Sequence, residues 1–265
     1  MQELRLSDWA LILGASSGFG AAAARAFAHA GMHIVGVHLD RRATMPAVEA
    51  LVADIRATGR QALFFNVNAA DEARRREVLD AVAAHLSGTG ERVRVLMHSL
   101  AFGTLKPYWE PSGDVITKAN MDMTLDVMAH SLLYWTQDLL RRDLFCRNAR
   151  IFAMTSAGSH AVWKTYGAVS AAKAALEAHC RQLAVELAPL DITANAICAG
   201  VTDTPALRKI PGHEAMIEVA LRRNPTGRLT TVEDVAQALC ALATPAARWI
   251  TGNVIRVDGG EDIAG

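Results

Sequence analysis

Short apolar runs alternate with longer amphipathic stretches along most of the chain. Residues 9–13, Trp-Ala-Leu-Ile-Leu, are continuously apolar, which is typical of a strand buried on both faces of a sheet. Similar β-branched or apolar runs recur, separated by stretches long enough to form helices. The predicted strands are residues 9–13, 33–37, 61–66, 93–98, 150–155, 192–197 and 253–257.

The stretches between these runs have the pattern of helices. Residues 16–30 are rich in alanine and are followed by Gly31, and Gly59 closes the next stretch, as glycine often does at a helix C-terminus. The predicted helices are residues 16–30, 45–58, 71–86, about 124–141 and about 166–187. Alternating strands and helices favour a parallel sheet with right-handed crossovers. We therefore predict a single α/β domain over residues 1–265, a Rossmann-type doubly wound parallel sheet of about seven strands with helices on both faces.

Residues 201–228 break this alternation. The segment contains three prolines and two glycines and is longer than an ordinary connection between elements. Because it follows the sixth predicted strand, it starts at the carboxyl edge of the sheet, where such folds bind ligands. We expect it to be a loop that covers a substrate.

Composition narrows the class of protein further. Hydrophobic residues make up 51% and charged residues 20% of the 265 residues, so a folded core is expected. Basic and acidic residues both number 27, which argues against nucleic acid as the main partner. The sequence has no apolar run of about 18 residues for a membrane span and no secretory signal at its start. The cysteines show no metal-binding spacing and are expected to be free thiols in a reducing cytoplasm; they are Cys146, Cys180, Cys198 and Cys240.

A glycine-rich loop, Gly-Ala-Ser-Ser-Gly-Phe-Gly at residues 14–20, lies directly after the first predicted strand. Glycines at this point let the backbone approach a pyrophosphate, and the N-terminus of the following helix supplies N–H donors. Small residues also serve close packing between a strand and a helix. After an N-terminal strand in a βαβ series, however, the loop favours dinucleotide binding.

Tyr166 and Lys173 are seven positions apart, almost two helical turns, so their side chains can share one face of a helix. A phenol beside an ammonium group can stabilise a developing oxyanion. Each residue could instead have an ordinary role, Tyr166 in packing and Lys173 on a solvated helix face. Beside the glycine loop, the pair favours a catalytic site.

Five motifs, in this order, resemble those of the short-chain dehydrogenase/reductase family and together span nearly the whole chain. They are residues 14–20, His98-Ser-Leu-Ala101, the Tyr166–Lys173 pair, residues 195–204 and Val257-Asp-Gly-Gly260. Within the family, the Tyr-x6-Lys spacing and residues 98–103 are similar to the bacterial enoyl-acyl-carrier-protein reductases. Met128 stands where most family dehydrogenases carry a catalytic asparagine, which the enoyl reductases also lack.

The resemblance implies an NAD(P)H-dependent enoyl-acyl-carrier-protein reductase of fatty-acid synthesis, in which hydride passes to the β-carbon of a trans-2-enoyl thioester. Tyr166 would stabilise the enolate oxygen, and Lys173 would reach the cofactor ribose. Ser156 is the third catalytic candidate. Many enoyl reductases have a second tyrosine there, whereas a Bacillus-type branch and the carbonyl-reducing members have serine. The alternatives are a carbonyl or alcohol oxidoreductase that uses Ser156 with Tyr166, and a nucleotide-binding module without catalysis.

The same resemblance implies which residues hold the cofactor. They are Gly14, Ser16, Ser17, Gly18, Phe19, Gly20, Arg41, Arg42, Asn66, Val67, Ser99, Leu100, Ala101, Lys173, Gly200, Thr202 and Thr204. His38 occupies the slot of the acidic residue that binds a ribose 2′-OH, and Arg41 with Arg42 could grip a 2′-phosphate. NADPH is the expected cofactor, and NADH stays open because Asp40 could turn toward the ribose.

The expected partner is an enoyl thioester of an acyl carrier protein or of CoA. The resemblance also implies a homotetramer in which the long helices form one interface. The histidines share no ligand spacing, so no metal is expected. Several cations form either a basic rim for an acidic carrier or an ordinary solvated face; they are Lys106, Arg208, Lys209, Arg222, Arg223 and Arg228.

Overall fold

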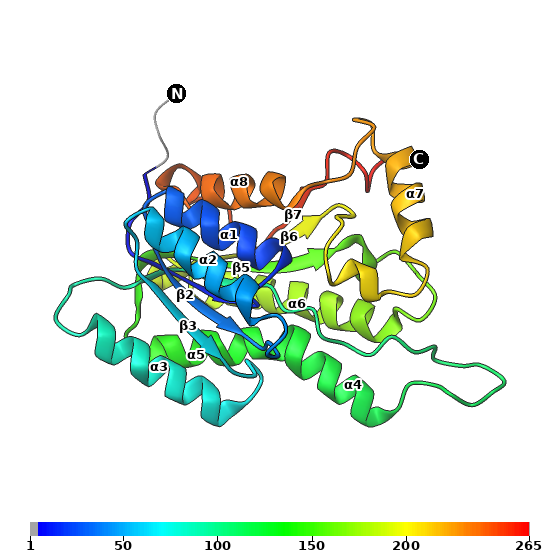
Figure 1. Ribbon diagram of the computed structural model, residues 1–265, viewed down its shortest axis with the longest axis horizontal. Coiled ribbons are helices and arrows are strands. Elements are labelled where there is room, and N and C mark those ends of the chain that lie inside the picture. Colours follow the sequence, from blue (N-terminus) through cyan, green and yellow to red (C-terminus); the bar gives the residue numbers. More distant parts are fainter. Residues whose placement is uncertain (1–4, 265) are drawn as a thin grey trace.

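A central parallel sheet organises the chain in the computed structural model, which describes residues 5–264 (Figure 1). The seven strands lie in the order β3-β2-β1-β4-β5-β6-β7, and all neighbours are parallel. The strands are β1 (Trp9–Leu13), β2 (His33–His38), β3 (Ala62–Asn66), β4 (Val93–His98), β5 (Phe145–Ser156), β6 (Thr193–Ala199) and β7 (Val254–Val257). The strand order reverses between β1 and β4, which is the point where doubly wound sheets bind ligands.

Helices cover both faces of the sheet, as the sequence predicts (Figure 1). They are α1 (Gly18–His29), α2 (Met45–Ala57), α3 (Glu72–Leu86), α4 (Lys118–Leu125), α5 (Ser131–Arg141), α6 (Gly167–Glu186), α7 (His213–Arg223) and α8 (Val232–Leu242). Helices α1, α2 and α8 pack on one face, and α3, α5 and α6 pack on the other. Within residues 5–264, no helix is both long enough and apolar enough to cross a membrane.

The first strand shows why its sequence is continuously apolar. Ala10 and Ile12 point into the core under α1 and α8, whereas Leu11 and Leu13 point into the core under α3, α5 and α6. All four side chains are 0% exposed. A strand buried on both faces has no position for a polar side chain, so the alternation typical of half-buried strands is absent.

The predicted strands are all confirmed, but the helices differ in two places. The long helix predicted from about residue 124 begins at Lys118, and a π-helical turn at Asp126–His130 separates α4 from α5. Helix α8 was not predicted, although Thr231 and Asp234 form a capping box at its start. The apolar face of α8 packs against α1 and completes that side of the core.

Segment 201–228, expected to be a loop, contains a helix. A 3₁₀ turn at Leu207–Lys209 and helix α7 (His213–Arg223) interrupt it, and α7 lies apart from the sheet at the right of Figure 1. Of the residues in α7, only Ala220 is buried. The segment therefore rests on the body of the molecule mainly through its two ends.

Candidate active site at the carboxyl edge of the sheet

The glycine loop after β1 packs too closely for side chains at two of its positions. A Cβ on Gly14 would lie 2.3 Å from the backbone oxygen of Ser99, and Gly14 has a φ of +86°. A Cβ on Gly20 would lie 2.0 Å from the backbone oxygen of Gly14. The loop therefore joins the start of α1 closely to the loop after β4, and its open backbone fits a pyrophosphate.

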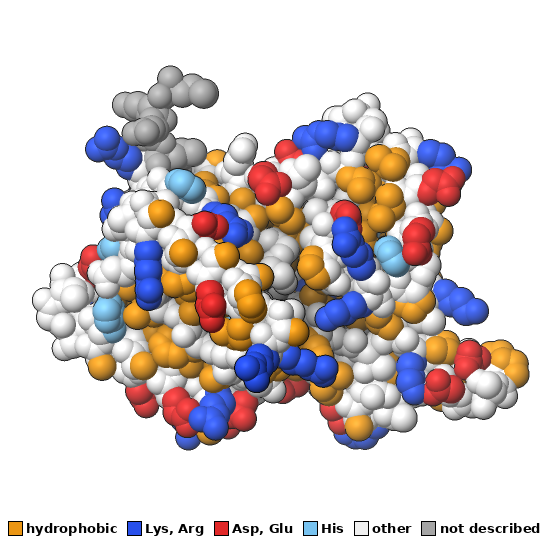
Figure 2. Space-filling model, in the orientation of Figure 1, with side chains coloured by type: hydrophobic (Ala, Val, Ile, Leu, Met, Phe, Trp, Pro, Cys, Tyr) orange, Lys and Arg blue, Asp and Glu red, His pale blue; other side chains and the backbone are white. Residues whose placement is uncertain are grey.

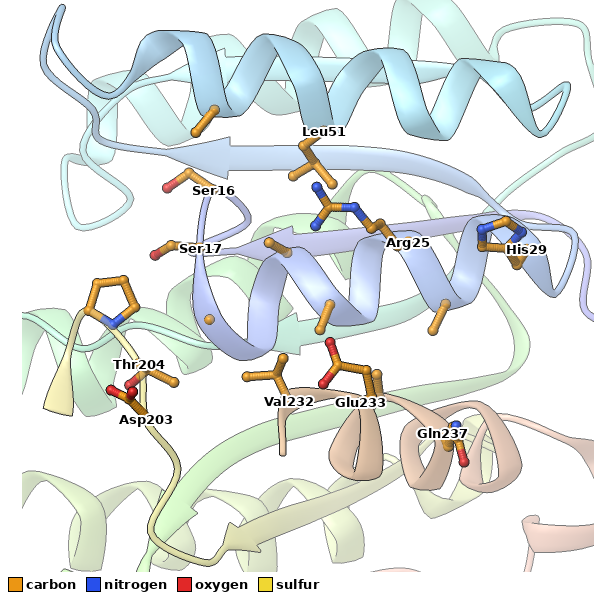
Figure 3. A pocket seen from close by; sticks show the side chains of 17 residues that line it. Ser16, Ser17, Arg25, His29, Leu51, Asp203, Thr204, Val232, Glu233 and Gln237 are labelled. Carbon is orange, nitrogen blue, oxygen red and sulfur yellow. The ribbon is translucent and has the colours of Figure 1, made fainter. Parts of the chain in front are cut away.

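The start of α1 opens into a groove of about 580 Å³. Ser16 and Ser17 point into it from the glycine loop, and Thr204 and Asp203 approach from the segment after β6 (Figure 3). The first turn of α1, all of it described, carries no acidic side chain. The N–H groups and the positive end of the helix dipole therefore face the groove with no carboxylate on the first turn of α1 itself, as a phosphate site favours, although Asp203 and Glu233 line the groove from other elements.

The loop after β2 turns Asp40 toward the glycine loop. Its carboxylate lies 3.0 Å from His38 Nδ1 and accepts a hydrogen bond of 2.7 Å from Thr44 Oγ1. Burial alone raises the pKa of Asp40, but hydrogen bonds from Ser16, Thr44 and His38 lower it below its usual value. Asp40 is therefore ionised beside Ser16, at the point where the adenosine end of a dinucleotide would lie.

Asn66, expected to help hold the cofactor, holds the backbone of this loop. Its Oδ1 accepts from the Asp40 N–H and its Nδ2 donates to the Asp40 carbonyl, each at 2.9 Å. Arg41 and Arg42, expected to grip a 2′-phosphate, are both exposed. The structure thus brings Asp40, rather than the two arginines, against the glycine loop.

Lys173 reaches from α6 into the space between β4 and β5. Its ammonium donates to the Met154 carbonyl at 2.7 Å and lies 3.5 Å from the Leu100 carbonyl. Burial lowers the pKa of Lys173 to about 8, partly offset by the Glu177 carboxylate. The lysine is still mostly a cation at neutral pH, and its carbonyl contacts fix its position between the ends of β4 and β5, next to the switch point of the sheet.

Tyr166 occupies the position before the first residue of α6, with φ −90° and ψ 0°. Burial raises the pKa of its phenol, and the neighbouring Ser156 hydroxyl lowers it by less. The phenol is therefore protonated at neutral pH and can donate a hydrogen bond. Ser156 Oγ is buried, and no residue within 5–264 hydrogen-bonds it with good geometry, so it remains available to a substrate oxygen.

Gly158, which the sequence did not single out, shapes the Ser156–Tyr166 pair. A Cβ at this glycine would lie 2.5 Å from Tyr166 Cε1 and 3.1 Å from Ser156 Oγ. The backbone of residue 158 therefore forms the surface against which the Tyr166 ring rests. The sequence held no signal for this contact, because an ordinary loop glycine looks the same.

Met128 fills the place where a relay asparagine is expected in the family dehydrogenases. It lies in the π-helical turn, is 2% exposed, and packs against Gly103, where a Cβ would be 2.9 Å from its sulfur. Next to it, His98 is fully buried with Nε2 2.9 Å from Ser131 Oγ. Burial lowers the pKa of His98 to about 3, so its imidazole is neutral at physiological pH. Met128 and His98 therefore contribute an apolar and a neutral group to the buried region around Lys173.

Both ends of segment 201–228 are tied to the chain that follows β7. The Val201 N–H donates to both carboxylate oxygens of Glu261, each at 3.2 Å. The buried Asn224 donates to the Asp258 carbonyl at 2.9 Å. The segment therefore starts and ends at fixed points beside the site, and Figure 2 shows a hollow between the part that carries α7 and the part formed by α1 and α2.

The cations considered as a basic rim are mostly paired with nearby carboxylates. Arg208 pairs with Asp203, and Arg228 pairs with Asp234. The remaining pairs are Lys106–Asp114 and Arg222–Glu218, and Arg223 donates to the carbonyl of Ala264. These contacts cancel much of the positive charge that an acidic carrier would meet, so the solvated face is the better interpretation.

A second cavity, of about 490 Å³, adjoins Tyr166 on the side away from the glycine loop. Its aromatic lining includes Tyr108, Trp109 and Trp163, none of which the sequence had identified as functional. Two of these residues belong to the loop after β4 and one to the loop after β5. Because the loops are far apart in sequence, only the folded chain places them together.

Comparison with known proteins identifies the family of the chain. The family model described as Enoyl-(Acyl carrier protein) reductase matches residues 14–261. The NADH-dependent enoyl-(acyl carrier protein) reductase of Aquifex aeolicus is 34% identical over 173 residues, which span 64% of this chain and 63% of that protein. The cis-4-hydroxycyclohexanecarboxylate dehydrogenase of Sinomonas cyclohexanicum is 31% identical over 266 aligned positions, 95% of each.

The structures agree over a longer range than the sequences. The crystal structure of the NADH enoyl-(acyl carrier protein) reductase from Aquifex aeolicus matches with a TM-score of 0.83 and 25% identity, covering 99% of this chain and 98% of that one. The sequence alignment with the Aquifex aeolicus reductase covers less than two thirds of that protein. The fold is thus shared over nearly the whole chain, whereas the substrate depends on the site itself.

Proposed function

Because the chain belongs to the short-chain dehydrogenase/reductase family whose model is described as Enoyl-(Acyl carrier protein) reductase, we propose that it is an enoyl thioester reductase. It is an oxidoreductase with a nicotinamide cofactor site, and the proposed reaction reduces the double bond of a trans-2-enoyl thioester. A bound reduced nicotinamide supplies the hydride. The protein residues orient the substrate and stabilise the charge that develops on it.

Tyr166 is the proposed hydrogen-bond donor to the thioester oxygen. As hydride reaches the β-carbon, negative charge moves onto that oxygen, and a phenol whose pKa is raised by burial is protonated and ready to donate. Lys173, held by the Met154 carbonyl, places a positive charge near the same region and has a donor left for a ribose hydroxyl. Reduction is completed by a proton at the α-carbon.

Met128 is the single observation that carries the proposal. According to the resemblance described above, most family dehydrogenases carry a catalytic asparagine at this place, which the enoyl reductases lack. Here that place holds a thioether that is 2% exposed and packs on Gly103. A thioether is a poor hydrogen-bonding group, so it supports a reaction in which the tyrosine acts mainly by stabilising an enolate.

Carbonyl or alcohol oxidoreduction is the second candidate, and Ser156 favours it. The buried Ser156 hydroxyl lies beside Tyr166 and is available to a carbonyl oxygen, which is the arrangement such a reaction uses. The Sinomonas relative, matched over 95% of its length, is a dehydrogenase of a hydroxycyclohexane carboxylate.

A matched pair of substrates separates the two functions. Crotonyl-CoA and acetoacetyl-CoA would be compared in cofactor oxidation by the wild type and by Ser156→Ala. The proposal expects turnover of crotonyl-CoA by the wild type. In Ser156→Ala, the rate with crotonyl-CoA should change by a few fold at most. If only acetoacetyl-CoA is turned over, and Ser156→Ala loses that activity by about a hundredfold or more, the protein is a carbonyl reductase.

NADH is the cofactor that we propose, in place of the NADPH expected from Arg41 and Arg42. An ionised Asp40 beside Ser16 would accept a hydrogen bond from a ribose 2′-OH and would repel a 2′-phosphate. We therefore expect Asp40→Asn to raise the ratio of kcat/KM for NADPH over NADH by at least about tenfold, because it removes a like charge at similar shape.

Arg41→Ala serves as the matched control for the cofactor prediction. If the arginines do not bind the cofactor, this variant leaves the ratio of kcat/KM values unchanged. Wild-type preference for NADPH, lost in Arg41→Ala, would show that Asp40 does not decide the choice.

Titration of Lys173 should make the activity fall at alkaline pH. Because burial lowers its pKa to about 8, the ammonium is present below that pH and is lost as the pH rises through it. We expect kcat/KM for the cofactor, which reports the free enzyme, to fall tenfold per pH unit above about 8. His98, with a pKa near 3, adds no limb around neutral pH.

Lys173→Arg provides the control, since a guanidinium keeps its proton over this range. Any activity that this variant retains should not fall above pH 8. A wild-type profile that stays level until about pH 10, where an unperturbed lysine titrates, would contradict the assignment.

Two further expectations from the resemblance remain proposals. The protein would act in fatty-acid synthesis in the cytoplasm, and it would assemble as a homotetramer with α4, α5 and α6 at one interface. Light scattering after size-exclusion chromatography would give the mass of the assembly. Because most of the nearby cations are paired, CoA thioesters are suitable substrates for the first assays.

A further inference from the structure

The cavity beside Tyr166 lies between two loops and the start of α6. Tyr108 and Trp109 line it from the loop after β4, Trp163 lines it from the loop after β5, and Tyr166 lies in the same wall. The loop after β4 projects from the body of the molecule at the lower right of Figure 1, and Figure 2 shows hydrophobic side chains near its tip. The cavity therefore continues directly from the catalytic phenol to an aromatic surface.

Two of the aromatic side chains contact other parts of the protein. The ring of Tyr108 rests on Gly167, where a Cβ would lie 2.5 Å from Tyr108 Cζ and 2.9 Å from its hydroxyl oxygen. The indole N–H of Trp163 lies 3.5 Å from the Pro211 carbonyl in segment 201–228. Both side chains thus line the cavity through contacts that already orient them toward it.

The lining of the cavity leaves much apolar surface in water. Trp109 is 77% exposed, Tyr108 is 59% exposed and Val162 is 95% exposed. Exposed apolar surface of this extent marks a place where another molecule binds. Because Tyr166 lines the same cavity, the substrate of the proposed reaction is the occupant that the geometry favours over a second protein.

Aromatic faces set at the sides of a cavity suit flat or ring-shaped ligands. Ring–ring contacts contribute beyond burial alone, whereas an extended aliphatic chain gains only the burial. We propose that this cavity binds the acyl part of the substrate and selects enoyl thioesters whose β-carbon carries a ring, of which cinnamoyl-CoA is the simplest. This inference rests on the proposed reduction of enoyl thioesters and names the substrate class for it.

The reaction on such a substrate balances without a further reagent. Hydride from the reduced nicotinamide forms the C–H bond at the β-carbon next to the ring, while the carbon–carbon double bond is reduced to a single bond. A proton from solvent completes the α-carbon, and the cofactor leaves oxidised. The product is the 3-phenylpropanoyl thioester.

The test compares cinnamoyl-CoA with trans-2-octenoyl-CoA, an extended thioester of similar size. For the wild type, we expect kcat/KM to be higher for cinnamoyl-CoA. Trp109→Ala should lower the ratio of the two kcat/KM values by about three- to tenfold, the range given by loss of one aromatic contact. Trp109→Phe, which keeps a ring, should recover most of the ratio.

Trp249→Ala is the matched control. Trp249 is 90% exposed and does not line the cavity, so its removal should leave the ratio unchanged. A ratio that is the same in the wild type and in Trp109→Ala, while both thioesters turn over, would overturn the acyl pocket and leave the proposed reaction intact. A Trp109→Ala variant that changes only the mass of the assembly would assign the surface to a second copy of the chain and also overturn the proposal.

A binding measurement separates the pocket from the reaction. Quenching of tryptophan fluorescence by 3-phenylpropanoyl-CoA, with oxidised cofactor present, needs no turnover. We expect Trp109→Ala to weaken this binding at least threefold, with Trp249→Ala unchanged. If that difference is found but no enoyl thioester is reduced, the proposed function fails while the ring-binding pocket stands.

Discussion

Replacement of Tyr166 by phenylalanine is expected to lower kcat for an enoyl thioester by about 10²–10³-fold, with a smaller change in KM. The substitution keeps the ring and its packing but removes the hydroxyl, whose protonated state is maintained because burial raises the pKa of the phenol. Loss of one preorganised donor to a developing oxyanion typically has an effect of this size. Steady-state kinetics with crotonyl-CoA would measure it.

Tyr108→Phe is the control for this substitution, because it also removes a phenol hydroxyl from the wall of the same cavity. It should leave kcat within a few fold of the wild type. A Tyr166→Phe variant that retains most of its activity, with Tyr108→Phe inactive, would mean that the donor has been assigned to the wrong tyrosine. Cofactor binding measured by fluorescence should be similar in both variants.

Gly158→Ala is expected to reduce kcat/KM by about 10²-fold although residue 158 has no chemical group to contribute. The added methyl would lie 2.5 Å from Tyr166 Cε1, closer than carbon atoms can pack, and 3.1 Å from Ser156 Oγ, a tight contact. The ring has to move, and a misplacement of about 1 Å at a catalytic group can cost that factor. Kinetics and thermal unfolding would be measured together.

Gly167→Ala provides the comparison for this effect. Its methyl would meet the ring of Tyr108, at 2.5 Å from Cζ, and that side chain is 59% exposed and free to swing outward. With crotonyl-CoA, Gly167→Ala should therefore stay within a few fold of the wild type. Equal losses in both variants, or a large fall in the unfolding temperature of Gly158→Ala alone, would point to general disruption of the loop instead.

Much of the fold was predictable because its signals are local. Continuous apolar runs such as residues 9–13 identify strands buried on both faces, and all seven strands lie where apolar or β-branched runs predicted them. Helix α8 was missed although its capping box, Thr231 with Asp234, is readable in the sequence. The π-helical turn at Asp126–His130 left no such signal, because one extra residue in a helix barely alters its apolar pattern.

The chain's own sequence determined the glycine loop, the Tyr166–Lys173 helix face and the apolar residue at position 128, since each depends on neighbours within about two helical turns. Only the tertiary structure decided that Asp40 turns toward Ser16, that Gly158 supports Tyr166, and that aromatic rings from two loops share one cavity. These features depend on which loops meet at the carboxyl edge of the sheet. Strand order and packing determine which loops lie next to each other, and no local pattern of residues encodes that arrangement.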